Sequence, residues 1–134
     1  MPESPQFLRT IGMKRYGEVL QAFVKRYRQA WKGQDLAFMV VQLPGLAKDL
    51  STRELIDAES PTEPMSWAWM REAQQQVLSL ENTYLATCID LGDKENAHPK
   101  DKYPIGERLA LLARKGVYGE DILSQGPYLS LIHI

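Results

Sequence analysis

Residues 36–43 read Leu-Ala-Phe-Met-Val-Val-Gln-Leu, and this nearly unbroken apolar run decides the fold class. Because apolar residues do not alternate with polar ones, both faces of the segment must be covered, which is typical of a strand inside a parallel sheet. Pro44 and Gly45 close the run. A second stretch, residues 83–89, is rich in β-branched and apolar residues and is also predicted to be a strand.

Three other segments carry apolar residues at steps of three and four, which predicts amphipathic helices. They are residues 14–31, residues 66–80 and a last helix that ends near Gly116. The apolar face of the first helix is expected to consist of Tyr16, Leu20, Phe23, Tyr27 and Trp31. A crossover of about 40 residues that contains a helix demands parallel strands, so the sheet should be parallel and covered by helices. Residues 47–64 form a polar, turn-rich loop that we expect near the functional site.

The composition excludes several classes of protein. Of 134 residues, 16 are basic and 17 acidic, so the formal net charge is -1 and nothing marks a surface for nucleic acid or an anionic membrane. The single cysteine, Cys88, rules out a disulfide within the chain and is expected to be a buried small apolar residue. No run approaches the roughly 18 apolar residues of a membrane helix. A neutral or small ligand is the expected partner.

The second predicted strand runs directly into the sequence Asp90-Leu-Gly-Asp93-Lys-Glu95-Asn-Ala-His98-Pro99. Ligands of open α/β sheets bind outside the carboxyl ends of the strands, so this loop is the candidate site. A histidine that follows a carboxylate by a few residues can be held in one tautomer and can act as general base toward a serine. The spacing alone leaves two other interpretations open. The loop could be an ordinary solvated surface, or Asp90, Asp93, Glu95 and His98 could be ligands of a hard divalent cation.

Several short stretches of the chain, considered together, resemble the sequence motifs of one known family. Around the loop they are Asp90-Leu-Gly-Asp93, His98-Pro99-Lys100-Asp101-Lys102 and Ile105-Gly106-Glu107-Arg108-Leu109-Ala110. Farther away they are Val41-Gln42-Leu43, Trp69, Arg71-Glu72-Ala73-Gln74, Val117-Tyr118-Gly119 and Gly126-Pro127. Together they resemble the sialate O-acetylesterase family of SGNH hydrolases, over roughly residues 14–128.

The resemblance implies an α/β fold, a three-layer sandwich with a parallel sheet of the flavodoxin-like SGNH type, here as a partial domain. It also implies a serine-type carbohydrate O-acetylesterase that hydrolyses acetyl esters on sialic acids or plant polysaccharides and needs no cofactor. His98 matches the catalytic histidine of the family. Asp93 and Glu95 are the candidates for the catalytic carboxylate that orients it, whereas Asp90 and Arg108 are expected to be structural.

Two blocks of the family are absent from this sequence. One, of the Gly-Gln-Ser-Asn type, supplies the nucleophilic serine, and the other, of the Gly-Glu-Ser-Asn type, supplies oxyanion contacts. No serine of this chain fits either role. We therefore expect residues 1–128 to be the C-terminal part of an esterase domain that is inactive alone and needs its missing N-terminal part. Residues 129–134 are expected to be a non-native or disordered tail.

Two alternatives to the esterase remain open. One is a non-catalytic carbohydrate-binding relative that has the fold but no serine. The other is a small α/β module that binds a divalent metal through the acidic loop. The sequence does not determine the compartment, although the resemblance suggests a periplasmic or secreted protein.

Overall fold

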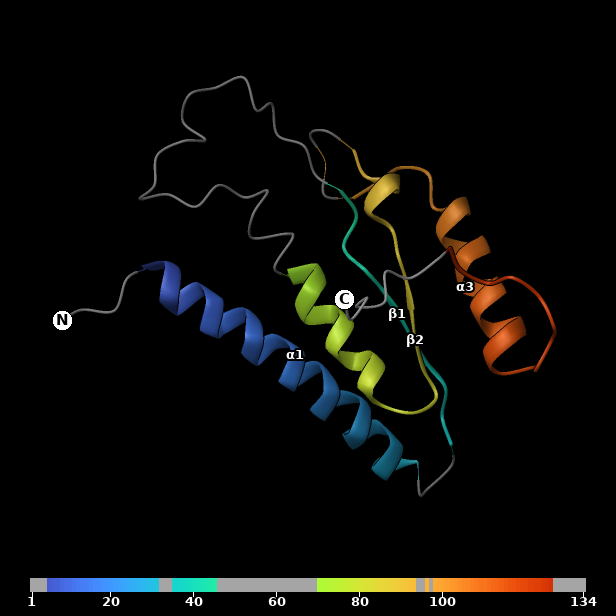
Figure 1. The fold of residues 1–134 in the computed structure, drawn as a ribbon, viewed down its shortest axis with the longest axis horizontal. Helices are drawn as coiled ribbons and strands as arrows, with labels where there is room; N and C mark the ends of the chain where they lie inside the picture. Colours follow the sequence, from blue (N-terminus) through green and yellow to red (C-terminus); the bar gives the residue numbers. More distant parts are fainter. Residues whose placement is uncertain (1–4, 32–34, 46–69, 94–95, 97, 127–134) are drawn as a thin grey trace, which may run out of the picture.

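The computed structural model describes residues 5–31, 35–45, 70–93, 96 and 98–126, with side chains described from residue 15 onward (Figure 1). The predicted loop 47–64, residues 66–69 of the predicted second helix and the predicted tail 129–134 lie outside these residues.

A small parallel sheet forms the centre of the fold. β1 (Phe38–Val41) pairs in parallel with β2 (Thr83–Ala86), in a register that places Phe38 opposite Thr83 and Val41 opposite Ala86. The predicted parallel pairing is therefore confirmed. Both strands contain the residues whose apolar or β-branched side chains predicted them.

Both strands end earlier than the sequence predicted. Backbone pairing reaches Gln42, whose N–H donates to the Ala86 carbonyl at 2.9 Å, and the chain then leaves the sheet. The prediction that the second strand reaches Ile89 was wrong, because the backbone bends at Cys88 (φ -133°, ψ 15°) into the 3-10 turn η3 (Ile89–Leu91). The Leu91 N–H donates to the Cys88 carbonyl at 3.0 Å and closes this turn.

The helices follow the predicted order with shifted ends. α1 (Pro5–Ala30) begins before residue 14, with a proline in its first turn, where the missing N–H costs nothing. The second helical segment, residues 70–75, continues as the 3-10 turn η2 (Gln76–Ser79). α3 (Tyr103–Gly116) ends at the predicted glycine. No helix within the described ranges is long and apolar enough to cross a membrane.

The face of α1 that packs against the fold is not the predicted one. Val24 is fully buried, and Gly17 is buried where α1 crosses the segment 70–79. A Cβ on Gly17 would lie 2.9 Å from the Ala73 carbonyl oxygen, so only glycine allows this approach. Much of the predicted face is exposed instead, namely Tyr16, Phe23, Tyr27 and Trp31. The prediction failed because a glycine at a close helix crossing carries no hydropathy signal.

Arg28 fastens the end of α1 to the beginning of both strands. Its guanidinium donates hydrogen bonds of 2.8–3.2 Å to three carbonyl groups and one hydroxyl, those of Leu36, Glu81, Asn82 and Thr83. The guanidinium carbon of Arg28 also lies 5.6 Å from the centre of the ring of Phe38, the first residue of β1. One cationic side chain therefore fixes where both strands start relative to α1.

Helices lie on both sides of the sheet. α1 and the segment 70–79 lie on one side, and α3 lies on the other (Figure 1). Side chains alternate accordingly along β2: Thr83 bonds Arg28 of α1, whereas the Tyr84 hydroxyl donates to the Gly116 carbonyl of α3 at 2.9 Å. Ala86, on the α3 side, packs in a buried cluster with Cys88 and Leu112. The described residues thus form a mixed α/β fold around a small parallel sheet.

Leu85 in β2 has no exposed surface, so its substitution tests how much the packing of this strand contributes to stability. Leu85→Ala should lower the free energy of unfolding by about 2–5 kcal/mol, because it removes buried methyl groups and leaves a cavity. Urea denaturation followed by circular dichroism measures this. Leu123→Ala, the same change at a side chain that is 84% exposed, should change stability by only about 0.5 kcal/mol. Equal losses in the two variants would contradict the placement of Leu85.

Candidate active site

The carboxyl ends of β1 and β2 lie at the same edge of the sheet because the strands are parallel. Residues 42–45 follow β1 and residues 87–93 follow β2. The two loops contact each other through the backbone, since the Gly45 N–H donates to the Ile89 carbonyl at 3.1 Å. This is the edge at which ligands of open α/β sheets bind.

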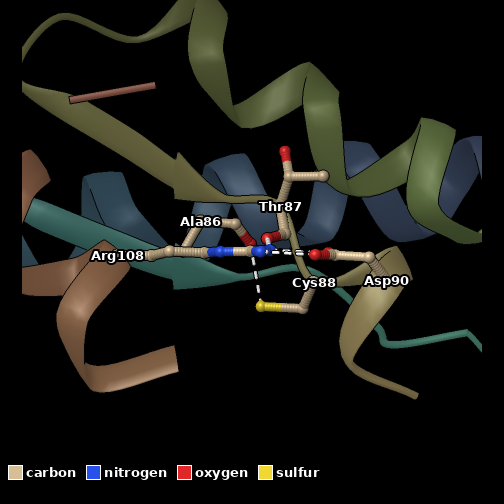
Figure 2. A network of polar contacts seen from close by, with 5 residues as sticks. All are labelled: Ala86, Thr87, Cys88, Asp90 and Arg108. Atoms are coloured by element: carbon tan, nitrogen blue, oxygen red, sulfur yellow. Dashed lines mark hydrogen bonds and ion pairs between the residues drawn. The ribbon is translucent and has the colours of Figure 1, made fainter. Parts of the chain in front are cut away.

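Arg108 of α3 closes the turn that follows β2 (Figure 2). Its Nη1 donates to the Thr87 carbonyl and, at 2.7 Å, to Asp90 Oδ1, while its Nη2 donates to Asp90 Oδ2. Both carboxylate oxygens of Asp90 are therefore engaged. The hydrogen bond from Arg108 holds the pKa of Asp90 below its usual value and raises the pKa of Arg108. These contacts agree with the structural roles expected for both residues.

Cys88 lies beneath this ion pair and is fully buried, as expected (Figure 2). Its Sγ donates to the Ala86 carbonyl at 3.5 Å. Burial raises the pKa of the Cys88 thiol and outweighs the opposing effect of the Arg108 charge. Cys88 is a packing residue of the buried cluster that also contains Ala86 and Leu112.

His98 lies on the loop between η3 and α3, with an exposed side chain. Its backbone N–H donates to Asn96 Oδ1 at 2.9 Å, an Asx turn that fixes the chain just before the histidine. Asp93 is partly exposed earlier on the same loop, whereas Glu95 lies outside the described residues. The structure therefore places His98 and Asp93 on one loop beyond the carboxyl end of β2. The contact between His98 and either carboxylate stays a prediction.

The divalent-metal interpretation of this loop loses support from the geometry. Asp90, one of its four suggested ligands, already has both oxygens bonded to Arg108. Within the part of the chain that the structure describes, no group of three or more histidine, cysteine or acidic side chains could hold a metal ion. Glu95, another suggested ligand, is not in that part.

Two buried glutamines, which sequence reasoning missed, hold the chain after β1. Gln74 Oε1 accepts from the Leu43 N–H at 2.9 Å, and its Nε2 donates to the Val41 carbonyl at 3.4 Å. Gln42 Nε2 donates to the Arg71 carbonyl at 3.1 Å. Gln42 and Gln74 are only 3% and 5% exposed. The one available signal was a glutamine inside an apolar strand run, because a buried amide needs partners.

A cavity of about 510 Å³ lies beside β2 and α3. Ala86 and Thr87 line it from the strand side, Arg108 and Leu112 from α3, and residues 123–126 from the segment that follows. Asp93 and His98 are not among its described lining residues. Among the described residues, the cavity therefore meets the loop after β2 at Thr87.

Comparison with known proteins supports an esterase-like fold. No protein-family model and no curated protein matches the chain. Among solved structures, the chain is similar to a carbohydrate acetylesterase from Xanthomonas citri, with 33% sequence identity and a TM-score of 0.70. The similarity covers 87% of this chain and 25% of that one, so the chain spans about a quarter of the acetylesterase's length. The fold is therefore acetylesterase-like, and the chain is related to carbohydrate esterases.

The Arg108–Asp90 pair predicts a pH dependence of stability. Because the folded-state pKa of Asp90 is lowered, the pair's contribution is complete above the unfolded value of about 3.9 and is lost as pH falls through the lower folded value. Asp90→Asn should therefore be less stable than the unchanged chain near neutral pH. The difference should shrink as pH falls below about 4.

Thermal unfolding measured from about pH 7 to about pH 2.5 checks this. Asp121→Asn, the same change at an exposed position, serves as the matched control for the loss of one carboxylate. A stability difference for Asp90→Asn that stayed constant down to the lowest pH would show that the ion pair does not produce it.

Proposed function

We propose that this chain is the C-terminal part of the catalytic domain of a serine-type carbohydrate O-acetylesterase of the sialate O-acetylesterase type. The observation that carries the proposal is the similarity to the Xanthomonas citri acetylesterase over 87% of the chain. The exposed position of His98 beyond the carboxyl end of β2 supports it, because a general base must be reachable by substrate. The substrate class is an acetyl ester on a sugar, and the complete domain is an SGNH-type three-layer sandwich.

In this proposal, His98 is the general base of a serine, histidine and acid mechanism. It takes the proton from the serine Oγ as the serine attacks the acetyl carbonyl, and then gives a proton to the departing sugar hydroxyl. It next activates the water that releases acetate from the acyl-enzyme. No cofactor is needed for these steps. The serine comes from polypeptide outside this chain.

The carboxylate that orients His98 is Asp93 or Glu95. Asp90 is a poor candidate, because Arg108 occupies both of its oxygens and the carboxylate closes a turn next to β2. Asp93 comes directly after Gly92 and precedes the Asx turn at Asn96, so it is close in sequence to the histidine it would orient. A carboxylate in this role holds one imidazole tautomer and stabilises the imidazolium that forms during the reaction.

Exposed apolar surface supports the proposal that the chain is part of a larger domain. Val19, Phe23 and Tyr27 of α1 follow one another at steps of four, Trp31 continues the spacing directly after the helix, and all four side chains are 47–64% exposed. Contiguous exposed apolar surface of this kind usually meets another protein surface. The Xanthomonas citri acetylesterase is about four times the length that this chain spans in it, which leaves ample polypeptide to cover such a stripe. We propose that the missing N-terminal part of the domain does so.

The experiment requires an extended protein in which this chain is joined to the preceding sequence of its own gene. We expect that protein to hydrolyse p-nitrophenyl acetate and O-acetylated sugars, and the 134-residue chain alone to hydrolyse neither above buffer background. His98→Ala in the extended protein should lower kcat by about 10³-fold or more, because loss of a triad base removes proton transfer from the serine. Initial-rate measurements check this.

The chain offers a matched control in its only other histidine, His133, which lies in the predicted tail. His133→Ala should leave turnover unchanged. Asp93→Asn and Glu95→Gln, made separately, should identify the orienting acid by a large loss in one of them. Near-normal turnover of His98→Ala would remove the catalytic assignment of this loop. An extended sequence with glycine or alanine in place of the expected serine would favour the carbohydrate-binding alternative.

A further inference from the structure

The two outer edges of the sheet differ in what covers them. On the outer edge of β2, Gln125 Nε2 donates to the Leu85 carbonyl at 2.9 Å, and Arg108 donates to the Thr87 carbonyl. Side chains from later in the chain therefore bind backbone acceptors of this edge, which makes it a poor template for another strand. Three of the four residues of β2 are also buried.

The outer edge of β1 is much more open. The N–H groups of Phe38 and Gln42 donate toward β2 at 3.1 and 2.9 Å, so the alternating backbone groups of Met39 and Val41 point to the opposite edge. Within the described part of the chain the sheet has two strands, and no backbone group pairs with Met39 on that edge. None of the four residues of β1 is buried, and Val41 is 40% exposed. Since residues 36–43 have the composition of a strand inside a parallel sheet, this edge suits a further strand.

Gln74 marks where such a strand has to end. Its Nε2 donates to the Val41 carbonyl at 3.4 Å, and its Oε1 accepts from the Leu43 N–H at 2.9 Å. These two backbone groups lie on the outer edge of β1, and a residue of a neighbouring parallel strand would bond both of them in the same way. The side-chain amide thus takes the place of one residue of that strand. Both backbone groups of Met39 and the N–H of Val41 are left for a partner.

The connections of the chain indicate which polypeptide reaches this edge. α1 and the helical segment 70–79 lie on the same face of the sheet, and they lead into β1 and β2 respectively (Figure 1). Crossover connections between parallel strands are right-handed in nearly all proteins, so two crossovers over one face advance in the same direction across the sheet. The second crossover advances from β1 to β2. A strand that leads through α1 into β1 therefore lies beside β1, on the side away from β2.

We propose that the polypeptide preceding α1 forms a strand that pairs in parallel with the outer edge of β1, through Met39 and the N–H of Val41, and ends beside Gln74. The proposal rests on the proposed function, in which this chain lacks the N-terminal part of its domain. The similar acetylesterase is about four times the length that the chain spans in it, so polypeptide for this strand is available. Because the added strand is parallel to β1, the loop from that strand to α1 lies at the edge that holds residues 42–45 and 87–93. That loop then contributes residues to the candidate site.

Hydrogen exchange along β1 in the extended protein tests the proposal, with other amides of the same strand region as controls. The amides of Phe38 and Gln42, which donate toward β2, report how stable the existing pairing is. With a strand on the outer edge, the amides of Met39 and Val41 should exchange within about tenfold of these two, after correction for intrinsic rates. An alternating pattern, in which the Met39 amide exchanges more than about tenfold faster than the Gln42 amide, would overturn the proposal.

Nuclear Overhauser contacts in the same protein identify the partner strand. The Met39 amide proton should contact α-protons of residues that precede α1, without the close contacts between two α-protons that mark antiparallel pairing. Contacts to residues 46–69 of this chain, or an antiparallel pattern, would overturn the proposal. So would contacts to a second copy, which a sample mixed from labelled and unlabelled protein separates from contacts within one chain.

Gln74→Met tests where the added strand ends. The substitution keeps the length of the side chain and removes both bonds to the edge of β1, so the Leu43 amide should exchange about tenfold faster or more while the Met39 amide stays protected. Gln125→Met, the same change on the outer edge of β2, should leave both amides unchanged. Unchanged Leu43 exchange in a folded Gln74→Met protein would overturn the stated end of the strand.

These measurements need no activity, so they separate the two proposals. A paired edge in an extended protein without esterase activity would contradict the proposed function alone. An active esterase in which the edge of β1 stays open would contradict this proposal alone.

Discussion

β1 and β2 pair in parallel, and both the connection between the strands and the position of the candidate site depend on that direction. Parallel strands cannot be joined by a tight turn, so the connection between them must cross one face of the sheet, and the helical segment 70–79 does so. The same direction brings both carboxyl ends to one edge. A pair of loops that are distant in sequence is thereby placed in backbone contact at the position where the candidate acid and histidine begin.

Two arginines secure opposite ends of this arrangement. Arg28 donates hydrogen bonds to carbonyl groups at the beginning of the strands, where α1 ends. Arg108 donates hydrogen bonds to a carbonyl and a carboxylate where β2 ends. The guanidinium group suits both places because its several donors are fixed in one plane. The two arginines differ in the charge of their partners, because the acceptors of Arg28 among the described residues are uncharged whereas Arg108 also binds the carboxylate of Asp90. Asp90 neutralises Arg108 beside the candidate site, and that carboxylate and that cation are occupied with each other.

Periodicity and turn residues predicted the two strands, their parallel pairing and the end of α3 at Gly116, because these depend on local pattern and connection length. The packing face of α1 was not predictable, since it is defined by Gly17 and Val24 and by an arginine that hydropathy assigns to solvent. The candidate loop was proposed because it follows a predicted strand, and its role stays a prediction. The contacts that hold it were missed, since Gln74 with Leu43 and Gly45 with Gly92 are about 30 to 50 residues apart in sequence and meet only in the fold.

The rate at which a serine-directed organophosphate such as diisopropyl fluorophosphate modifies the extended protein tests most directly whether His98 is a general base. The reagent phosphorylates an activated serine Oγ and releases fluoride, and the base accepts the serine proton. The account predicts a single serine adduct by mass spectrometry and a modification rate that falls by about 10³-fold or more in His98→Ala. Modification of the His98→Ala protein at the unchanged rate would contradict it.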